Sequence, residues 1–253
     1  MALALAGFAL PGAPASSVAA VGDPVAAIQH QLVKGRGVRV VVYNTSNNGD
    51  GWRHFKPTKG VVGFGDGKVM ATDLVDHQMQ GVRDICIGKR IWQYKPWGND
   101  PKGKKWVTYP WKCDLRLGAG DLRLDKPAVL AAVLSTATSE RPSGTYDSVS
   151  TTLHQGVMTF RQLWEVRPEL RPKREDESSS WPIEWRLWIG KDGLVRRAWV
   201  TWRESDQSSL KGATNGQGWF GFAEDIRYSG WGTKLTIKPP PPTQTTAINF
   251  PKH

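Results

Sequence analysis

The first feature that could carry chemistry is a serine and a lysine at catalytic spacing. Ser208-Ser209-Leu210-Lys211 matches the Ser-x-x-Lys motif that holds the nucleophilic serine of penicillin-recognising enzymes. Those enzymes also need Ser-Asp-Asn and Lys-Thr-Gly partner motifs, and the sequence contains neither. Their serine stands at the start of a helix, whereas this motif lies in a segment rich in Gly, Ser and Asn. We therefore interpret it as a chance match and predict no catalytic residue.

Two other segments resemble sites for a metal ion or a phosphate. Asp73, Asp76 and His77 occur together in TDLVDH, but such a cluster at a strand end is typical of solvated polar surface. GFGDGK at 63–68 lies between two strand-like segments instead of opening a helix, so a hairpin turn is the better interpretation. The five histidines form no HExxH motif. Two carboxylates could still converge for hydrolysis, although no spacing indicates such a pair. The sequence thus favours a non-enzymatic protein without metal or cofactor.

The charge of the chain bears on its partners. The 253 residues carry a formal net charge of +11, which favours polyanions. The 34 lysines and arginines are dispersed, and the densest cluster, at 171–177, alternates in sign as a solvated surface does. We therefore expect no nucleic acid partner. An anionic membrane surface or a cell-wall polymer remains as the partner that would attract the positive charge.

The first twenty residues resemble an export signal. An apolar run from Leu3 to Leu10 is followed by Pro11 and Pro14, and Ser17-Val18-Ala19 gives a small-x-small cleavage pattern. No Lys or Arg precedes the apolar run, which suggests that the true start lies upstream. A buried N-terminal helix is the alternative interpretation. We expect residues 1–20 to be a signal peptide and the mature protein to be secreted into the cell envelope.

Cys86 and Cys113 are the two cysteines of the chain, an even count that suits an exported protein. Both fall in strand-like segments that are separated by one further hairpin. A disulfide between them would stabilise the fold by about 3–4 kcal/mol. Two buried free thiols are the alternative.

Short strands joined by tight turns must position any site. Glycine (27) and proline (17) are frequent and spread along the chain, which favours turns over long helices. Helical spacing predicts helices at 24–33, 126–137 and 159–166, the last with a Thr159–Gln162 capping box. Strands are expected at 37–46, 52–65, 68–75, 81–87, 89–95, 104–112, 183–189, 194–202, 219–230 and 233–239, and a pair of strands within 146–159. The pattern predicts one α+β domain over 21–238, a large antiparallel sheet with a few helices, and a flexible tail over 239–253.

Strand parity selects the residues that could line a cavity. Side chains two residues apart on a strand share a face, and apolar sets of this kind mark a dry face. Parity identifies the dry face but cannot separate a cavity wall from ordinary core, so both interpretations stay open. The cavity-wall candidates are Val38, Val40, Val42, Trp92, Tyr94, Ile183, Trp185, Leu187 and Ile189.

The segment WIGKDGLVRRAWVTW, which begins at Trp188, places three tryptophans and two arginines around a turn. The Asp-Gly pair at 192–193 supplies that turn. Arg196 and Arg197 have opposite parity, so they belong to opposite faces and cannot form a phosphate clamp. Trp188 is expected on the wetter face, and Val195 on the face of Arg197. Arg196 shares the dry face and is a candidate for the mouth of a cavity.

The order of these elements resembles the LolA-like superfamily, in particular its actinobacterial secreted branch. Four places carry the resemblance: the valine-rich strand that ends in Thr45-Ser46, the KPAVLAAVL helix followed by TTLHQG, the LWIGKDGLVRRAWV hairpin, and the closing YSGWGTKLTIKPP run. They cover most of residues 25–242, and none is a catalytic signature. The superfamily includes periplasmic lipoprotein carriers and mycobacterial lipid-binding lipoproteins of the LppX and LprG type.

The resemblance implies an incomplete antiparallel barrel wrapped on helices, with an apolar cavity between sheet and helices that holds lipid or lipoprotein acyl chains. Mycobacterial members are anchored through a cysteine at the cleavage site, and none precedes Cys86 here, so no lipid anchor is expected. The leading hypothesis is a secreted monomer that carries or senses a lipid-like apolar ligand. The alternative is an envelope-associated binding module for a cell-wall polymer or a regulatory protein, with Trp97, Trp111 and Trp231 as exposed contacts.

Overall fold

One large sheet organises the part of the chain that the structure describes. The computed structural model describes residues 22–48, 51–94, 103–109, 113, 115–174, 177–204 and 220–248. Its strands are β1 (Arg36–Asn48), β2 (Trp52–His54), β3 (Thr58–Gly65), β4 (Lys68–Asp76), β5 (Val82–Ile87), β6 (Arg90–Tyr94), β7 (Trp106–Tyr109), β8 (Gly118–Ala119), β9 (Leu122–Arg123), β10 (Ala137–Tyr146), β11 (Val149–Thr159), β12 (Pro182–Gly190), β13 (Val195–Glu204), β14 (Phe220–Lys234) and β15 (Thr245–Ala247). The helices are α1 (Pro24–Gln31), α2 (Pro127–Ser135) and α3 (Phe160–Val166).

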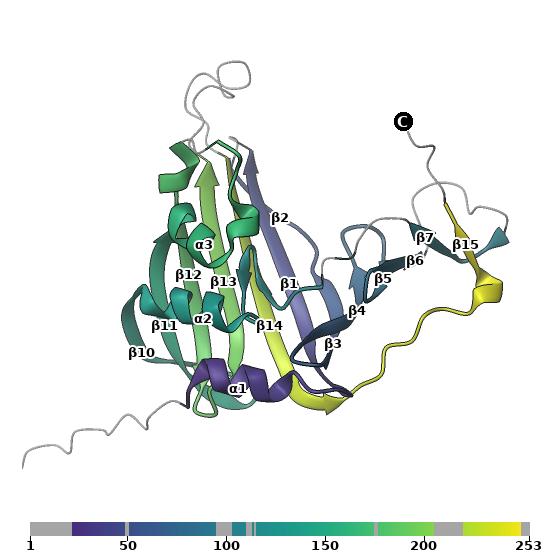
Figure 1. Cartoon of the computed structure of the whole chain (residues 1–253), viewed down its shortest axis with the longest axis horizontal. Coiled ribbons are helices and arrows are strands. Elements are labelled where there is room, and N and C mark those ends of the chain that lie inside the picture. Colours follow the sequence, from purple (N-terminus) through teal and green to yellow (C-terminus); the bar gives the residue numbers. More distant parts are fainter. Residues whose placement is uncertain are drawn as a thin grey trace, which may run out of the picture.

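The large sheet has 13 strands and is open. Its neighbours follow the order β10-β11-β12-β13-β14-β1-β3-β4-β5-β6-β7-β15, with β2 paired to β1. All of its pairs are antiparallel except that of β15 with β7. The helices lie along the β11–β14 part of the sheet, while β5, β6 and β7 extend away from them (Figure 1). The predicted α+β class, a large antiparallel sheet with a few helices that does not close, is confirmed.

Two of the three described α-helices, α1 and α3, begin at a side-chain cap, and α2 begins at a proline. The Asp23 carboxylate accepts a hydrogen bond from the Val25 amide at 2.9 Å, and prolines stand in the first turn of α1 and α2. The predicted capping box of α3 is present, because Thr159 and Gln162 bond to each other's backbone amides. Each helix turns apolar side chains toward the sheet, and α2 buries Val129, Leu130 and Val133. These contacts, more than helix propensity, fix such short helices.

The main hydrophobic core lies between the helices and the sheet. It joins Ile28 of α1 and the apolar face of α2 to the dry faces of β12, β13 and β14. A second, smaller cluster of Ile85, Trp92 and Trp106 lies in the β5–β7 part of the sheet. The molecule therefore has a thick helix-covered half and a thinner extension that carries its own small core.

The β12–β13 hairpin follows the predicted turn but contains a bulge. Trp188 pairs with Arg197 and Ile189 pairs with Val195, so Arg196 is the extra residue. The bulge reverses the parity on its turn side, and Val195 is fully buried in the core instead of lying with Arg197. Trp188 is also buried, because the Arg197 guanidinium covers its ring, with the Arg197 Cζ atom 4.3 Å from the ring centroid. The expectation for Val195 was wrong. Trp188 lies on the expected face, opposite Arg197, but it is buried there. The bulge also removes the strict alternation from which Arg196 and Arg197 were predicted to lie on opposite faces.

Several predicted element boundaries differ from the structure; the strand expected over 52–65, for example, is divided into β2 and β3. Residues 137–146 form the edge strand β10, which the sequence did not predict because its side chains are mostly exposed and it contains Pro142. Residues 235–238 were expected to form a strand, but β14 ends at Lys234. Ile237 nevertheless packs against the small cluster of β5–β7, which explains the apolar pattern of this segment.

The proline-led C-terminal segment joins the sheet. Thr245–Ala247 form β15, which pairs in parallel with Trp106–Thr108 of β7. The Lys104 ammonium donates a hydrogen bond to the Thr243 carbonyl at 2.7 Å. The segment expected as a flexible tail is thus, over residues 245–247, a paired edge strand; residues 249–253 lie outside the described part.

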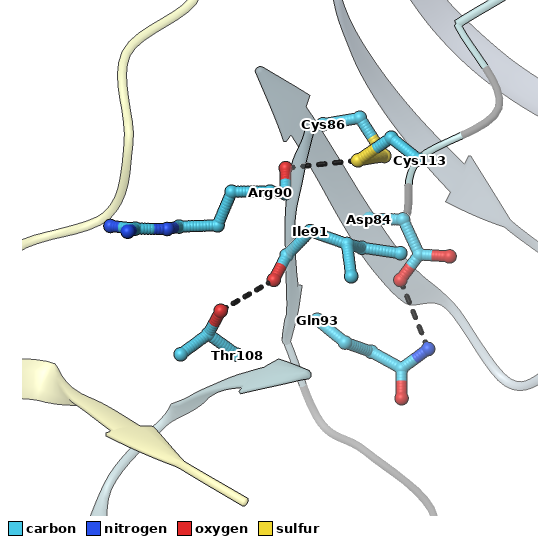
Figure 2. Close-up of a disulfide and its surroundings, with 7 residues drawn as sticks. All are labelled: Asp84, Cys86, Arg90, Ile91, Gln93, Thr108 and Cys113. Atoms are coloured by element: carbon cyan, nitrogen blue, oxygen red, sulfur yellow. Dashed lines mark hydrogen bonds between the residues drawn. A yellow bond between two sulfur atoms is a disulfide. The ribbon is translucent and has the colours of Figure 1, made fainter. Parts of the chain in front are cut away.

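The predicted disulfide is present. Cys86 of β5 is bonded to Cys113, with the two Cα atoms 5.8 Å apart. Figure 2 shows the Cys113 sulfur beside the Arg90 carbonyl oxygen, at 2.9 Å, and the amide of Gln93 donating to Asp84 at 3.0 Å. The bond ties the chain after β7 back to β5, so it stabilises the thin extension of the sheet.

The predicted signal peptide, residues 1–20, lies outside the described residues. Among the helices that the structure describes, none combines the length and the apolar character needed to cross a bilayer.

Candidate ligand-binding cavity

An inner cavity of about 240 Å³ lies against the concave face of β14, β1, β3 and β4. Its opposite wall is the roof hairpin, which we define as residues 115–125 around β8 and β9. None of the described lining residues belongs to a helix, because the helix-covered part of the sheet is filled by the core. The apolar side chains that line the inner cavity are Val40, Val42, Val62, Leu74, Leu117 and Ile226.

Buried charges hold the roof hairpin in place. The Arg123 guanidinium donates to both carboxylate oxygens of Asp125, at 2.8 and 2.7 Å, and to the Leu115 carbonyl at 2.8 Å. Asp125 also accepts a hydrogen bond from the Leu117 amide at 3.4 Å. Gly120 at the tip has φ +53°, and a Cβ there would come within 2.8 Å of the Trp202 ring. The hairpin therefore packs closely on the sheet on one side and leaves the cavity on the other.

Polar groups line the inner cavity among these apolar side chains. The Glu224 carboxylate is 8% exposed, accepts a hydrogen bond from the Gly120 amide, and lies 3.7 Å from the Arg116 guanidinium. Tyr228 is 2% exposed, and its hydroxyl has no hydrogen-bond partner among the described residues. Burial, and secondly the charge of Glu224, raise the pKa of Tyr228 far above its usual range. The Tyr228 hydroxyl therefore stays protonated at every ordinary pH.

An outer cavity of about 440 Å³ adjoins the inner one. The two share Asn44, Thr58, Arg116 and Glu224 as lining residues, so the Arg116–Glu224 pair stands at their junction. The outer cavity is bordered by three apolar side chains that are unusually exposed: Phe55 (36%), Met79 (44%) and Phe222 (42%). We call these three the apolar rim. Trp202 stacks on Phe222 with ring centroids 5.7 Å apart and extends this surface inward.

The structure places the cavity-wall candidates in three different environments. Val40 and Val42 line the inner cavity, while Val38 lies in the adjoining core. Trp92 is buried in the small cluster of the extension, and Tyr94 packs against it. The β12 candidates are packed in the main core, where for example the Trp185 indole donates to the Thr136 hydroxyl at 3.0 Å; they are Ile183, Trp185, Leu187 and Ile189.

Arg196 lines neither cavity. Its side chain is 5% exposed and donates to the Asp192 carboxylate at 2.6 Å, within its own hairpin. Its Nε atom has no partner among the described residues. The same hairpin contacts the start of α1, where the Gly22 amide bonds to the Lys191 carbonyl at 3.2 Å. Arg196 therefore holds together the turn of its own hairpin, and Lys191 of that turn contacts the start of α1.

Parity alone did not find Glu224, Tyr228 or the roof hairpin. In the sequence, Glu224 and Tyr228 stand two residues before and after Ile226, so strand parity places all three on one face. Only the pairing of β14 with β1 shows that this face meets Val40 and Val42. The roof hairpin has no sequence pattern that relates it to these strands. Tertiary contacts bring the two together.

The segments with possible enzymatic chemistry have structural roles where they are described. Asp73 is paired with Arg83 at 2.6 Å, and Asp76 accepts bonds from the Gln78 and Met79 amides in a turn. The Asp-Gly pair at 66–67 forms the β3–β4 turn, as expected. Within the described residues no group of three or more His, Cys, Asp and Glu side chains could hold a metal ion. The Ser-x-x-Lys segment at 208–211 lies outside them.

Of the three tryptophans of the alternative hypothesis, Trp231 is the one that the structure describes. Trp231 is partly buried, its indole donates to the Val195 carbonyl at 2.9 Å, and its ring stacks near Phe64 at 5.9 Å. It borders an open cleft that also carries Lys34, Arg36 and Lys234. Trp97 and Trp111 lie outside the described residues.

Comparison with known proteins gives similarity at the level of solved structures. No protein-family model and no curated protein matches the chain. The lipoprotein LppX of Mycobacterium tuberculosis is 16% identical, with a match over 85% of this chain and 98% of that chain and a TM-score of 0.43. LprF of Mycobacterium bovis is 18% identical, with a match over 87% of this chain and 99% of that chain and a TM-score of 0.45. A LolA superfamily protein of Nitrosomonas europaea is 12% identical, with a match over 85% of this chain and 94% of that chain and a TM-score of 0.28.

Proposed function

We propose that this protein is a non-enzymatic, extracytoplasmic binding protein that carries or senses a lipid-like apolar ligand. The observation that carries the proposal is the pair of adjoining cavities, which lead from the exposed apolar rim to an interior lined by Val40, Val42 and Ile226. Exposed large apolar side chains that gather at a cavity mouth indicate a surface that is covered during function. No group of the described chain has a comparable arrangement for catalysis.

The dimensions and lining of the cavities suit partition of an apolar molecule out of water. Small-molecule pockets commonly measure about 300–1,000 Å³. The inner and outer cavities, at about 240 and 440 Å³, together fall in this range. Apolar surface that leaves water for such a cavity gains about 25 cal/mol per Å². A chain of methylene groups would therefore bind through burial alone, without any charged partner.

An anionic membrane surface is the partner we propose for delivery and uptake of the ligand. Lys56 lines the outer cavity beside Phe55, and the chain as a whole carries a net charge of +11. Positive charge attracts anionic lipid headgroups, while apolar side chains at the same place insert between them. The disulfide between Cys86 and Cys113 supports a location outside the cytoplasm, where such bonds persist.

A substitution that fills the inner cavity tests the proposal. We expect the purified protein to bind the neutral fluorescent probe N-phenyl-1-naphthylamine, and Val42→Phe to weaken that binding about fivefold or more, because the ring occupies the cavity. Val41→Phe is the matched control, since the Val41 side chain lies on the opposite face of β1 and should change the affinity less than about twofold. Thermal melting of both variants checks that they fold.

Two results would contradict the proposal. One is a wild-type protein that binds no apolar probe and shows no co-purified lipid by native mass spectrometry after isolation from its own host. The other is an equal loss of probe affinity in both variants, which would locate binding outside the cavity. Retention of such a protein on purified cell wall would favour the alternative function as an envelope-polymer binding module.

A further inference from the structure

The orientation of the cavity follows from one strand. Along β14 the residues that face the cavities are Phe222 at the rim, Glu224 at the junction of the two cavities, Ile226 in the inner wall and Tyr228 in the inner cavity alone. Six residues of strand span about 20 Å. A ligand that entered at the rim and lay along β14 would pass the Arg116–Glu224 pair and meet Tyr228 with its inner end.

Tyr228 is the polar group that such an inner end would meet. Its side chain is 2% exposed, and its hydroxyl oxygen has no hydrogen-bond partner among the described residues. The Gly118 backbone lowers the pKa of Tyr228, an effect smaller than the opposite effect of burial. An amide N–H can only donate. The Tyr228 hydroxyl proton therefore has no acceptor, and a buried hydroxyl that does not donate a hydrogen bond costs free energy.

The charge of the acceptor is limited by the same surroundings. Burial and the negative charge of Glu224 disfavour an anion at the Tyr228 oxygen, and they outweigh the opposing positive charge of Arg116. They disfavour a ligand carboxylate at that position for the same reason. A cation or an alkyl end would supply no acceptor at all. The group that fits is a neutral oxygen.

We propose that the ligand of this cavity is an apolar chain that carries a neutral oxygen, as a ketone, ester or hydroxyl, at its inner end, and that the Tyr228 hydroxyl donates a hydrogen bond to this oxygen. The inference rests on the proposed function and sharpens it, because it separates neutral oxygenated lipids from free fatty acids and plain hydrocarbons. Tyr228 is then the residue that sets ligand specificity, and the apolar walls supply most of the affinity.

The test uses three probes and one isosteric variant of the full chain. N-phenyl-1-naphthylamine reports the cavity itself, and its displacement gives the affinities of 2-dodecanone and dodecanoate. In Tyr228→Phe we expect the affinity for 2-dodecanone to fall about fivefold to tenfold, the loss of one hydrogen bond. The affinities for dodecanoate and for the fluorescent probe should change less than about twofold. Tyr43→Phe is the control, because Tyr43 lies on the opposite face of β1, against Arg227.

The outcomes separate the inference from the proposed function. If the wild type binds no fluorescent probe, both fail. If it binds the probe, but Tyr228→Phe binds 2-dodecanone as the wild type does, or loses dodecanoate to the same extent, the function stands and the inference is overturned. A second measurement does not depend on the variant: the infrared carbonyl stretch of bound 2-dodecanone should lie below its value in hexane. An unshifted stretch contradicts the hydrogen bond.

Discussion

Arg123 and Asp125 show how single side chains shape the cavity. Each is largely removed from water, and each satisfies the other through two charge-assisted hydrogen bonds. Such a pair gains little over an apolar pair of the same size, but it is costly to break from one side. Because the pair also holds the Leu115 carbonyl and the Leu117 amide, it fixes the roof hairpin over β14 and β1. The inner cavity is therefore preformed in the folded chain.

His154 is a partly buried residue whose titration should be visible in the stability of the protein. Its side chain lies on β11, its Nδ1 atom is 3.7 Å from the Glu140 carboxylate, and its Nε2 atom has no partner among the described residues. Burial lowers the pKa of His154, and the weaker attraction of Glu140 opposes this shift. The folded protein therefore binds a proton at His154 less readily than the unfolded chain does.

We predict that acidification removes stability through His154. A folded-state pKa below the unfolded value of about 6.5 means that the contribution of the neutral imidazole is present above pH 6.5. It is lost as the pH falls through the folded-state pKa. Urea unfolding at pH 7.5 and 5.5 should show a smaller loss of unfolding free energy in His154→Gln than in the wild type. A wild type that gains stability on acidification relative to the variant would show that Glu140 dominates instead.

At the scale of elements, the sheet divides into a part that carries the cavities and a part that carries the disulfide. The strands of the cavity wall are β14, β1, β3 and β4. Cys86 and Cys113 tie β5 to the chain after β7, and the side chain of neither cysteine lines the two cavities. The two parts share β4, which pairs with both β3 and β5.

This division predicts that loss of the disulfide affects stability more than binding. The double variant Cys86→Ser with Cys113→Ser should have a free energy of unfolding about 3–4 kcal/mol lower than wild type, as expected when a disulfide joins residues 27 positions apart. Limited proteolysis should then cut first between β5 and β7. The affinity for N-phenyl-1-naphthylamine should stay within about twofold of wild type at a temperature where the variant is folded. A proportional loss of binding would show that the extension shapes the cavity.

At the scale of the whole molecule, the apolar rim is the feature that relates the cavities to a partner. Phe55, Met79 and Phe222 come from three separate segments and gather around the outer cavity. Val157, which is 47% exposed on β11, provides a comparison because it lines neither cavity. If the apolar rim docks on a membrane, a charged substitution in the rim should weaken vesicle binding, whereas the same substitution at the isolated Val157 should leave it unchanged.

We predict that Phe222→Asp weakens sedimentation with vesicles of phosphatidylglycerol and phosphatidylcholine at least threefold, because it removes apolar area and adds a negative charge. Val157→Asp should leave sedimentation unchanged. Added salt should weaken the binding of the wild type, since exposed charges contribute to it. Equal effects of the two substitutions, or binding that does not depend on salt, would contradict docking through the rim.

The sequence by itself determined the elements and much of their local chemistry. The periodicity of Val38, Val40 and Val42, the Thr159–Gln162 capping box and the Asp-Gly turns are local patterns, because their partners lie within a few residues. The antiparallel α+β class follows from many short strands with tight turns. The disulfide could be favoured from the even cysteine count alone.

Only the tertiary structure decided which dry faces surround a cavity. Ile183, Trp185 and Val40 all alternate as cavity walls would, but helices cover the first two, and the roof hairpin leaves space over the third. The bulge at Arg196 and the pairing of β15 with β7 also depend on contacts between distant segments. Parity records whether a side chain leaves water, and not whether protein atoms or empty space receive it. Tertiary packing sets that difference, and it is tertiary packing that places Tyr228 at the inner cavity.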